Sequence, residues 1–392
     1  ENEFYVPHIQ HSAIENHCAI AQADPEGKIT VWTGCQSPYA VRRTLAVAFN
    51  MPLNKIRVIS LAIGGGFGAK AGTTLEGIVM PLAQQANYRP VKLRFSREDV
   101  FTNTFIRQGM YARIKTGVTK DGKIIAEKNT FYWDGGAYTE YGVNIARAGG
   151  YASTGPYDIP NVKADSICVY TNHPVGGPYR GFGMSEIHFA IEQNLDIVAH
   201  KIGMDPAEFR RINALKDGST TVTGQVLENV GLMQCLDKVT EDIEWDKRAK
   251  KVSKIKYRGK GIACMYKAPS MPNNVGSSAI VKINEDGTVN LLVTAMDMGQ
   301  GSDTVLTQIA AEVLTIPISQ ISIMTGDTDC TPYEWQTVAS RTTYCCGNSV
   351  KRAVEDAKNQ MLKLASLKFS ISENDLELKD GQIISKIHPD KK

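Results

Sequence analysis

The order of hydrophobic and polar positions predicts a compact unit of hairpin, helix and strand near the start of the chain. Two runs of alternating apolar and polar residues flank the turn Asp24-Pro25-Glu26-Gly27, as in a β-hairpin. The next apolar positions recur at steps of three and four residues, which is typical of an amphipathic helix. Pro52 ends that helix, and an apolar run follows it. The predicted elements are the strands 17–23 and 28–33, the helix 38–49 and the strand 56–61.

The same unit recurs later in the chain. A second hairpin turns through Asn284-Glu285-Asp286-Gly287, and Pro317 lies between a helix-like segment and a strand-like run. Gly287 takes the position of Gly27 in the first unit, and Pro317 takes that of Pro52. The shared order of elements indicates two related subdomains. The second unit comprises the strands 279–283 and 288–294, the helix 303–314 and the strand 321–325.

The remaining periodicity predicts an α+β fold with hairpins and packed helices. The longest predicted helix, residues 185–201, repeats its apolar side chains at helical steps and ends near Gly203. Residues 240–258 are charged and irregular, as at a domain boundary. The further predicted elements are the strands 111–118 and 123–133 and the helices 73–86 and 207–215. We predict two related mixed α/β subdomains, residues 1–245 and 256–392, the second of them incomplete.

Composition excludes several classes of partner. The chain has 42% hydrophobic and 22% charged residues, which is ordinary for a globular protein. Its net charge of +3 comes from scattered residues, so nucleic-acid binding has no electrostatic support. No apolar run reaches the roughly 20 residues that cross a bilayer. We expect neither a nucleic-acid partner nor a membrane.

The cysteines point to a reducing compartment. The eight cysteines contain no C-x-x-C pair, which argues against a zinc site or a cysteine-bound iron–sulfur cluster within this chain. Adjacent Cys345 and Cys346 form a poor chelate. We expect reduced cysteines and a cytoplasmic location.

Three glycine-rich turns each lie between a strand-like run and a helix-like one, at residues 64–70, 176–183 and 298–301. Glycine permits positive φ and close approach of a ligand, and N–H groups that open toward a helix start suit an anion. The first turn is not a phosphate-binding Walker loop, because Ala71 follows Lys70 where that motif needs Ser or Thr. The shared form predicts that the three turns converge on one large ligand.

These turns, in this order, resemble the molybdopterin-binding subunit of the xanthine dehydrogenase and aldehyde oxidoreductase family. The similarity runs through nearly the whole chain, and residues 223–229 favour the branch that includes nicotinate dehydrogenase. Glu15 matches a structural Glu-x-His turn of the family. The segments that carry the resemblance are 14–17, 64–70, 179–183 and 297–301, with 203–206 and 337–340 as weaker support.

The resemblance implies a molybdenum–molybdopterin cofactor, in its cytosine dinucleotide form, whose metal is held by the pterin dithiolene and not by protein side chains. It places Gln36 and Arg180 in catalytic positions, with Gln36 bonded to a metal oxygen ligand. A structural glutamine and a surface or ion-paired arginine are the alternatives. Backbone N–H groups, amides and an arginine are the donors that an anionic cofactor needs. The expected cofactor-binding residues are Gly66, Phe67, Gly68, Arg180, Met298, Gly299, Gln300, Gly301, Ala339 and Ser340.

The same resemblance implies a substrate site. Phe182 matches a substrate-stacking aromatic, with a core phenylalanine as the alternative, and Arg147 matches a substrate-orienting arginine. Ala71 stands where purine-oxidising members carry a glutamate. Xanthine is therefore disfavoured, while a smaller or differently charged heterocycle remains open.

By resemblance, the chain is a subunit of a hydroxylase that oxidises a purine- or nicotinate-like aromatic N-heterocycle with water as oxygen source. An aldehyde-oxidising enzyme and a non-catalytic pterin-binding module are the alternatives. The implied partners are a 2Fe–2S subunit, a FAD subunit and a second molybdopterin-binding chain. The family's general base is a glutamate in a Gly-Glu-Pro turn, which this sequence does not contain. We expect that base on the partner chain or on a missing segment.

Overall fold

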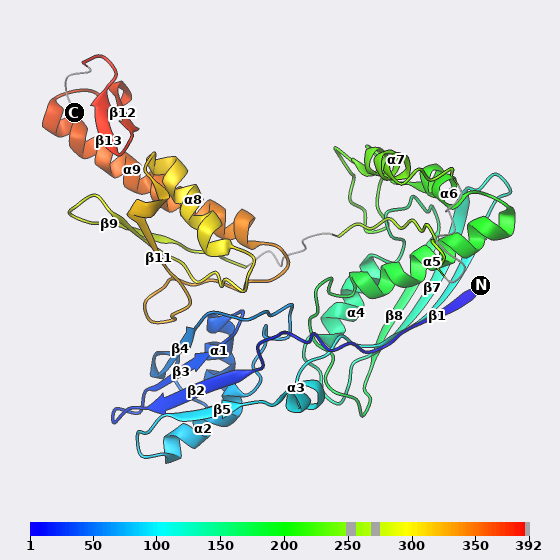
Figure 1. Cartoon of the computed structure of the whole chain (residues 1–392), viewed down its shortest axis with the longest axis horizontal. Coiled ribbons are helices and arrows are strands. Elements are labelled where there is room, and N and C mark those ends of the chain that lie inside the picture. The colour runs from blue at the N-terminus through cyan, green and yellow to red at the C-terminus, as the bar shows by residue number, and fades with distance from the viewer. Residues whose placement is uncertain (248–255, 268–274, 389–392) are drawn as a thin grey trace. The chain divides into compact units, whose positions relative to one another are not determined.

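The computed structural model describes residues 1–247, 256–267 and 275–388 (Figure 1). The chain forms two compact units, each built from two separate parts of the sequence. Unit 1 comprises Glu1–Gln10 and Phe105–Ala268, and unit 2 comprises His11–Thr104 and Pro269–Lys392. Residues 248–255 of the predicted boundary and the last residues of the tail, 389–392, lie outside the described residues.

Unit 2 contains both repeated units that the hydrophobic pattern predicts. Each has an antiparallel hairpin whose second strand then pairs in parallel with the strand after the helix. In both, a proline opens a short 3-10 turn just before that last strand. The first repeat comprises β2 (Cys18–Ala23), β3 (Ile29–Thr33), α1 (Pro38–Ala48) and β4 (Ile56–Ser60). The second comprises β9 (Ile280–Ile283), β10 (Val289–Leu292), α8 (Ser302–Leu314) and β11 (Ile321–Met324).

Each repeat of unit 2 has its own hydrophobic core. The alternating residues of β3, such as Val31, pack against Val41 and Leu45 of α1. In the second repeat, Leu291 of β10 packs with Leu306 of α8 in the same way. The buried faces of these strands and helices are therefore the apolar faces that the sequence pattern predicts. The first sheet gains β5 (Val91–Arg94), and α2 (Glu76–Gln85) packs on it. Helix α3 (Arg97–Asn103) follows β5 in the sequence.

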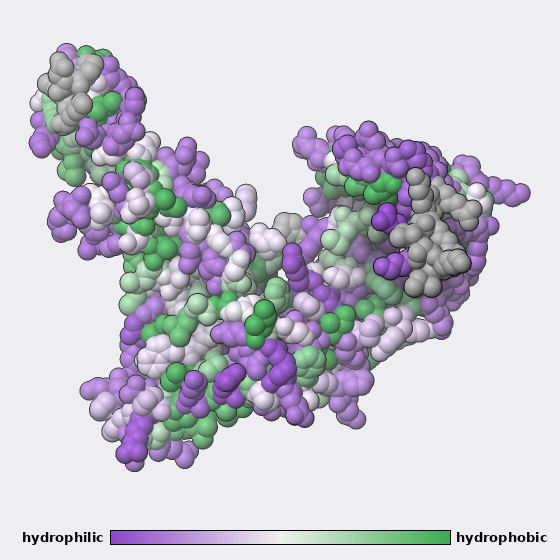
Figure 2. Space-filling model, in the orientation of Figure 1, coloured by the Kyte–Doolittle hydropathy of each residue, from purple (hydrophilic) through white to green (hydrophobic). Residues whose placement is uncertain are grey.

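The longest helix of the described residues, α9 (Gly347–Phe369), is absent from the sequence-based prediction. It follows a π-helical turn, Thr342–Cys346, and packs along α8 with Val350 and Val354 buried. Over α8 and α9, Figure 2 shows hydrophobic residues mixed with hydrophilic ones rather than one continuous apolar face. The hairpin of β12 (Leu376–Lys379) and β13 (Gln382–Ser385) follows α9.

Unit 1 is built on one mixed sheet in the order β1-β6-β7-β8. The predicted third hairpin and long helix are both confirmed, and helix α5 packs on β1 and β6 around Ile187, Ile191 and Leu195. Among the described residues, no helix combines the length and the apolar character that crossing a bilayer requires. The strands are β1 (Asn2–Val6), β6 (Met110–Val118), β7 (Ile124–Asp134) and β8 (Val162–Val169). The helices are α4 (Gly142–Tyr151), α5 (Met184–Ile202), α6 (Pro206–Asn213) and α7 (Leu232–Asp242). The predicted α+β class is confirmed.

Strand β7 carries a buried carboxyl group. Glu127 accepts hydrogen bonds from Asn129 Nδ2 at 3.0 Å and from Thr116 Oγ1 at 3.2 Å. Burial raises the pKa of Glu127 from 4.5 to about 7, although these two hydrogen bonds lower it. The folded chain therefore keeps this proton well above the pH at which the unfolded chain loses it.

We expect Glu127 to make stability fall as the pH rises. Above pH 4.5, ionisation of Glu127 lowers the free energy of the unfolded chain, whereas the folded chain keeps Glu127 protonated until about pH 7. Between these two pH values the free energy of unfolding falls by roughly 3 kcal/mol, and above about pH 7 Glu127 causes no further fall. In Glu127→Gln this fall should disappear, as measured by urea unfolding at about pH 5 and about pH 8. The exposed Glu228→Gln serves as control. The assignment fails if wild type and Glu127→Gln show the same pH dependence.

Candidate functional site

The first glycine turn, residues 64–71, follows β4 and adopts a left-handed backbone at several positions. The φ angles of Gly65 and Gly68 are 94° and 109°. Phe67 also has a positive φ, 55°, although it carries a bulky side chain. Such conformations persist only where the surroundings hold them in place, and they gather at functional sites.

Glu15 holds this turn in position. Its Oε2 accepts a hydrogen bond from the Gly64 N–H at 2.8 Å and pairs with the Nζ of the buried Lys70. The backbone N–H of Glu15 donates to the Gly64 carbonyl at 3.1 Å. His17 adds a contact from its Nε2 to the Ala69 carbonyl at 3.2 Å. The Glu-x-His segment is therefore structural in this chain, as the sequence predicts.

Gln36 connects the turn to a second loop of unit 2. Its Oε1 accepts from the Gly68 N–H at 3.0 Å, and its Nε2 donates to the Thr337 carbonyl at 3.1 Å. The side chain is buried, with Gln36 only 3% exposed. A glutamine amide has two N–H donors, so one of them is left without a protein acceptor among the described residues. That N–H can donate to a ligand beside the turn.

Gly66 brings the first and third turns together. A Cβ added at Gly66 would lie 2.5 Å from the Gln36 Oε1 and 2.9 Å from the Met298 Sδ. Real Cβ atoms do not approach other atoms that closely, so only glycine fits at this position. Two of the three glycine turns therefore meet within unit 2.

The third turn is held largely by its own side chains. The Gln300 Oε1 accepts from the Met298 N–H at 2.7 Å, while Nε2 donates to the Met296 carbonyl at 2.8 Å and to the Ser302 Oγ at 3.1 Å. Both N–H donors of the amide are thus used, and only a lone pair on the oxygen is left for a ligand. Gly301, with φ 79°, ends the turn as the N-cap of α8.

A cavity of about 320 Å³ lies between the residues that follow β4 and the third turn. Asp297 and Asp303 line it, together with Ile63 and Met296. Burial raises the pKa of Asp297, but hydrogen bonds from backbone N–H groups, with Gly299 the strongest, outweigh it and leave the pKa low. Burial and the charge of Asp297 raise the pKa of Asp303 to about 6. The cavity is therefore anionic, and it suits a group that donates hydrogen bonds.

The loop around Thr337 completes this part of unit 2. The Thr337 N–H donates to the Gln36 carbonyl at 3.1 Å, and its Oγ1 accepts from the Met296 N–H at 2.8 Å. Ala339 and Ser340 are both left-handed, with φ of 53° and 56°. Sequence reasoning identified Thr337 only within a weaker matching segment, although it contacts both Gln36 and the residues that begin the third turn.

The second glycine turn lies in unit 1, at the start of α5. Gly181, Phe182 and Gly183 have φ of 112°, 53° and 90°. Phe182 packs against the Tyr141 ring with centroids 6.1 Å apart and joins the edge of the core. Arg107 fixes the turn from inside, because its Nη2 donates to the Arg180 carbonyl at 2.8 Å.

The two predicted arginines of unit 1 have exposed side chains. Arg147, on α4, donates from its Nη2 to the Asn144 Oδ1 at 2.9 Å. For the Arg180 side chain, no hydrogen bond or ion pair occurs within the described residues. Helix α4 packs directly against Gly183, where an added Cβ would lie 2.9 Å from the Ile145 carbonyl oxygen. The alternative of an ion-paired Arg180 therefore has no support in the described part of the chain.

Ala71 is buried at the end of the first turn. It is 1% exposed, and its N–H donates to the Gly68 carbonyl at 3.2 Å. The predicted site residues thus fall into two groups, one in each unit. Unit 2 holds Gln36, Gly66, Phe67, Gly68, Ala71, Met298, Gly299, Gln300, Gly301, Ala339 and Ser340, and unit 1 holds Arg147, Arg180 and Phe182.

Comparison with known proteins identifies the family. The sequence matches the molybdopterin cofactor-binding domain over residues 1–214, and a second domain of the same description over residues 238–392. The chain belongs to the molybdopterin cofactor-binding family. The resemblance drawn from the three glycine turns is confirmed.

Individual relatives place the chain within this family. It is 32% identical over 391 residues to the xanthine dehydrogenase molybdenum-binding subunit of Escherichia coli O157:H7, covering 98% of this chain and 52% of that protein. It is 36% identical over 242 residues to the nicotinate dehydrogenase large molybdopterin subunit of Eubacterium barkeri, covering 62% and 57%. The structure of quinoline 2-oxidoreductase from Pseudomonas putida 86 matches with a TM-score of 0.89 at 26% identity, over 100% of this chain and 52% of that one. The chain spans about half the length of these relatives.

The residues of unit 2 fit a molybdopterin cofactor. Gln36 packs closely on Gly66, and its second amide N–H has no acceptor among the described residues, so it can donate to the cofactor. The nearby cavity offers two carboxyl groups, which suit the amino and ring N–H groups of a pterin. The same carboxyl groups would repel a diphosphate, so we expect the diphosphate to bind elsewhere.

Gly66→Ala should lower the cofactor content of the purified chain. The added methyl group must displace both Gln36 and Met298, which disturbs the contact between the first and third turns. Molybdenum and pterin per chain measure this directly. Gly77→Ala is the matched control, because a Cβ there would meet nothing within 4 Å. Equal cofactor content in the two variants would show that the Gly66 contact does not support binding.

Proposed function

We propose that this chain is the molybdenum-cofactor-binding part of a hydroxylase that oxidises an aromatic N-heterocycle with water as oxygen source. The observation that carries the proposal is the cradle formed by Gln36, Gly66 and Met298, in which the buried Gln36 amide keeps one N–H donor without an acceptor among the described residues. The names of the relatives support the oxidoreductase assignment.

In this proposal the residues of the chain bind and orient the cofactor, and they supply hydrogen-bond donors to it. The bound cofactor supplies the redox chemistry and the activation of water. Gln36 would donate its free N–H to an oxygen of the cofactor, and the exposed Arg180 guanidinium would bind an anionic group. The left-handed backbone at Phe67, Ala339 and Ser340 would present N–H groups in fixed directions.

We further propose the cytosine dinucleotide form of the cofactor, and 2Fe–2S and FAD groups on partner chains. The relatives named as subunits support an assembly of several chains. We place the enzyme in the cytoplasm, where the eight cysteines, all free in the structure, stay reduced. We also propose that residues 1–245 and 256–392 form the two molybdopterin-binding subdomains, and the two family matches, over residues 1–214 and 238–392, support this.

The substrate proposal rests on what lies at two positions. Ala71 puts a small buried residue where a carboxylate would bind a purine edge, while Arg147 presents a cation on α4. We therefore propose an anionic or small heterocycle as the substrate in preference to xanthine. An aldehyde substrate is the second candidate, and a non-catalytic pterin-binding module is the third.

A substrate panel tests this choice. We expect the complete enzyme to oxidise nicotinate-like acids faster than xanthine, because Arg147 attracts a carboxylate. Arg147→Ala should raise the KM for the acids more than the KM for uncharged heterocycles. Faster turnover of xanthine than of any acid in the panel would refute the proposal.

Arg180→Ala should lower molybdenum content or turnover. The loss of one charge-assisted hydrogen bond costs roughly 1.5–3 kcal/mol, which is about ten- to a hundredfold in binding or rate. Arg43→Ala, an exposed arginine on α1, is the control. Molybdenum content and turnover that both match the control would remove Arg180 from the site.

The 392 residues alone should be inactive even when they carry the cofactor. The reaction requires a general base, and the Gly-Glu-Pro turn that supplies it in the family is absent from this sequence. We propose that the base belongs to another part of the assembly. An assay of the cofactor-loaded chain with an artificial electron acceptor measures this. Turnover equal to that of the full assembly would mean that a carboxylate of this chain, Glu15 first, is the base.

A further inference from the structure

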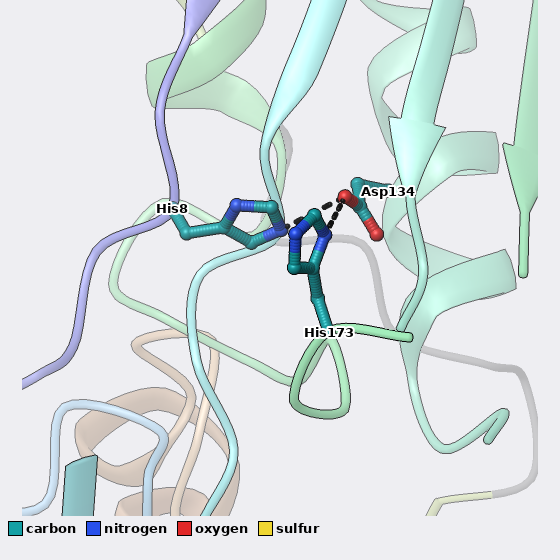
Figure 3. A group of neighbouring side chains, drawn as sticks. All are labelled: His8, Asp134 and His173. Atoms are coloured by element: carbon teal, nitrogen blue, oxygen red, sulfur yellow. Dashed lines mark hydrogen bonds and ion pairs between the residues drawn. The ribbon is translucent and has the colours of Figure 1, made fainter. Parts of the chain in front are cut away.

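Two histidines and an aspartate from three distant segments meet at one edge of the unit 1 sheet (Figure 3). His8 follows β1, Asp134 is the last residue of β7, and His173 lies in the loop after β8. One ligand atom from each of the three side chains lies within 4.8 Å of the other two. The Asp134 Oδ2 is 3.2 Å from the His8 Nε2 and 2.5 Å from the His173 Nδ1.

Hydrogen bonding alone does not account for the cluster. The His8 Nε2 is buried and close to the carboxylate, yet it makes no hydrogen bond within the described residues. When the imidazole proton is on Nδ1, the Nε2 of His8 presents a lone pair that can bind a metal ion.

The Asp134 carboxylate is held in an orientation that leaves one oxygen available for a metal ion. The Asp134 Oδ1 accepts from the Thr171 hydroxyl and from the Gly136 N–H, the latter at 3.2 Å. Its Oδ2 is left to face the two imidazoles (Figure 3). Contacts of this kind behind the ligands fix the orientation of metal-binding side chains.

The backbone holds the three segments together before any ion arrives. The Asp134 N–H donates to the Gly109 carbonyl at 2.9 Å, and the Arg107 N–H donates to the Ile9 carbonyl at 2.9 Å. The Ala137 N–H donates to the His173 carbonyl at 3.0 Å. Gly136 has φ 79°, and a Cβ there would lie 2.3 Å from the Pro174 carbonyl oxygen, so the loop depends on glycine at this point.

We propose that His8, Asp134 and His173 bind a divalent first-row transition-metal ion of the zinc class. Two imidazole nitrogens and one carboxylate oxygen form a ligand set for such an ion and leave a position for water. Ligands of a tetrahedral zinc lie about 3.3 Å apart, which matches the pair His8 and Asp134. His173, whose side chain is 59% exposed, can rotate to widen its own distance and opens the site to solvent. The cysteine-based argument against zinc does not apply, because no cysteine takes part.

Calorimetry on the chain of 392 residues tests the proposal. After dialysis against EDTA, we expect one Zn²⁺ per chain to bind at neutral pH, and at least tenfold weaker binding in His173→Ala and Asp134→Asn. Asp134→Asn can keep the contacts to Thr171 and Gly136 while it removes the charge. The exposed His200→Ala, at the end of α5, is the matched control and should bind as wild type does. Mg²⁺, which prefers oxygen ligands, should not compete.

Co²⁺ distinguishes this site from the free cysteines. The Co²⁺ complex should show no thiolate charge-transfer band, and binding should survive alkylation of the thiols. Circular dichroism of each variant checks that it is folded. The proposal is overturned if wild type binds no Zn²⁺, if His173→Ala binds it as tightly as wild type, or if thiol alkylation abolishes binding.

Discussion

The geometry of unit 2 depends on the amide of a single buried glutamine. Gln36 accepts from the Gly68 N–H and donates to the Thr337 carbonyl, so its side chain joins two segments that are far apart in sequence. A buried amide that loses one partner costs about 1–3 kcal/mol, which makes the two loops mutually dependent. Only glycine fits at position 66, because this amide and the Met298 side chain occupy the space that a methyl group would need. Packing thus sets the shape of the cradle formed by Gln36, Gly66 and Met298, and the hydrogen bonds of Gln36 maintain it.

The local pattern predicts the repeated elements well. Alternation and three- or four-residue steps yield both hairpins, both helices and both strands of the repeat, because each element buries one face against its neighbours. Helix α9 was missed even though Val350 and Val354 recur at helical spacing, since its polar residues dominate the run. That both units are built from separate stretches of sequence was also missed, because pairings such as β1 with β6 leave no local signal.

The site shows the same division between local and distant information. Glycine turns are readable because positive φ and close approach demand glycine, so Gly66, Gly68 and Gly301 could be predicted. The hydrogen bonds that each side chain makes could not be predicted from the sequence. Gln300 donates both of its amide N–H groups to atoms beside its own turn, whereas one amide N–H of Gln36 has no acceptor among the described residues. His8 and His173 carry no motif at all, since only the sheet brings them to Asp134.

The interrupted course of unit 2 has a consequence for how the protein is made. His11–Thr104 leave the ribosome well before Pro269–Lys392, with Phe105–Ala268 of unit 1 synthesised between them. Until Thr337 emerges, the Nε2 of Gln36 has no carbonyl to donate to, and the Ser60 N–H lacks the Gly326 carbonyl that it meets at 2.7 Å. The nascent chain therefore lacks these two hydrogen bonds until the second part of unit 2 has been synthesised. If the proposed cofactor binds beside Gln36, its complete binding site exists only after that stage, so insertion would be a step of maturation and not of co-translational folding.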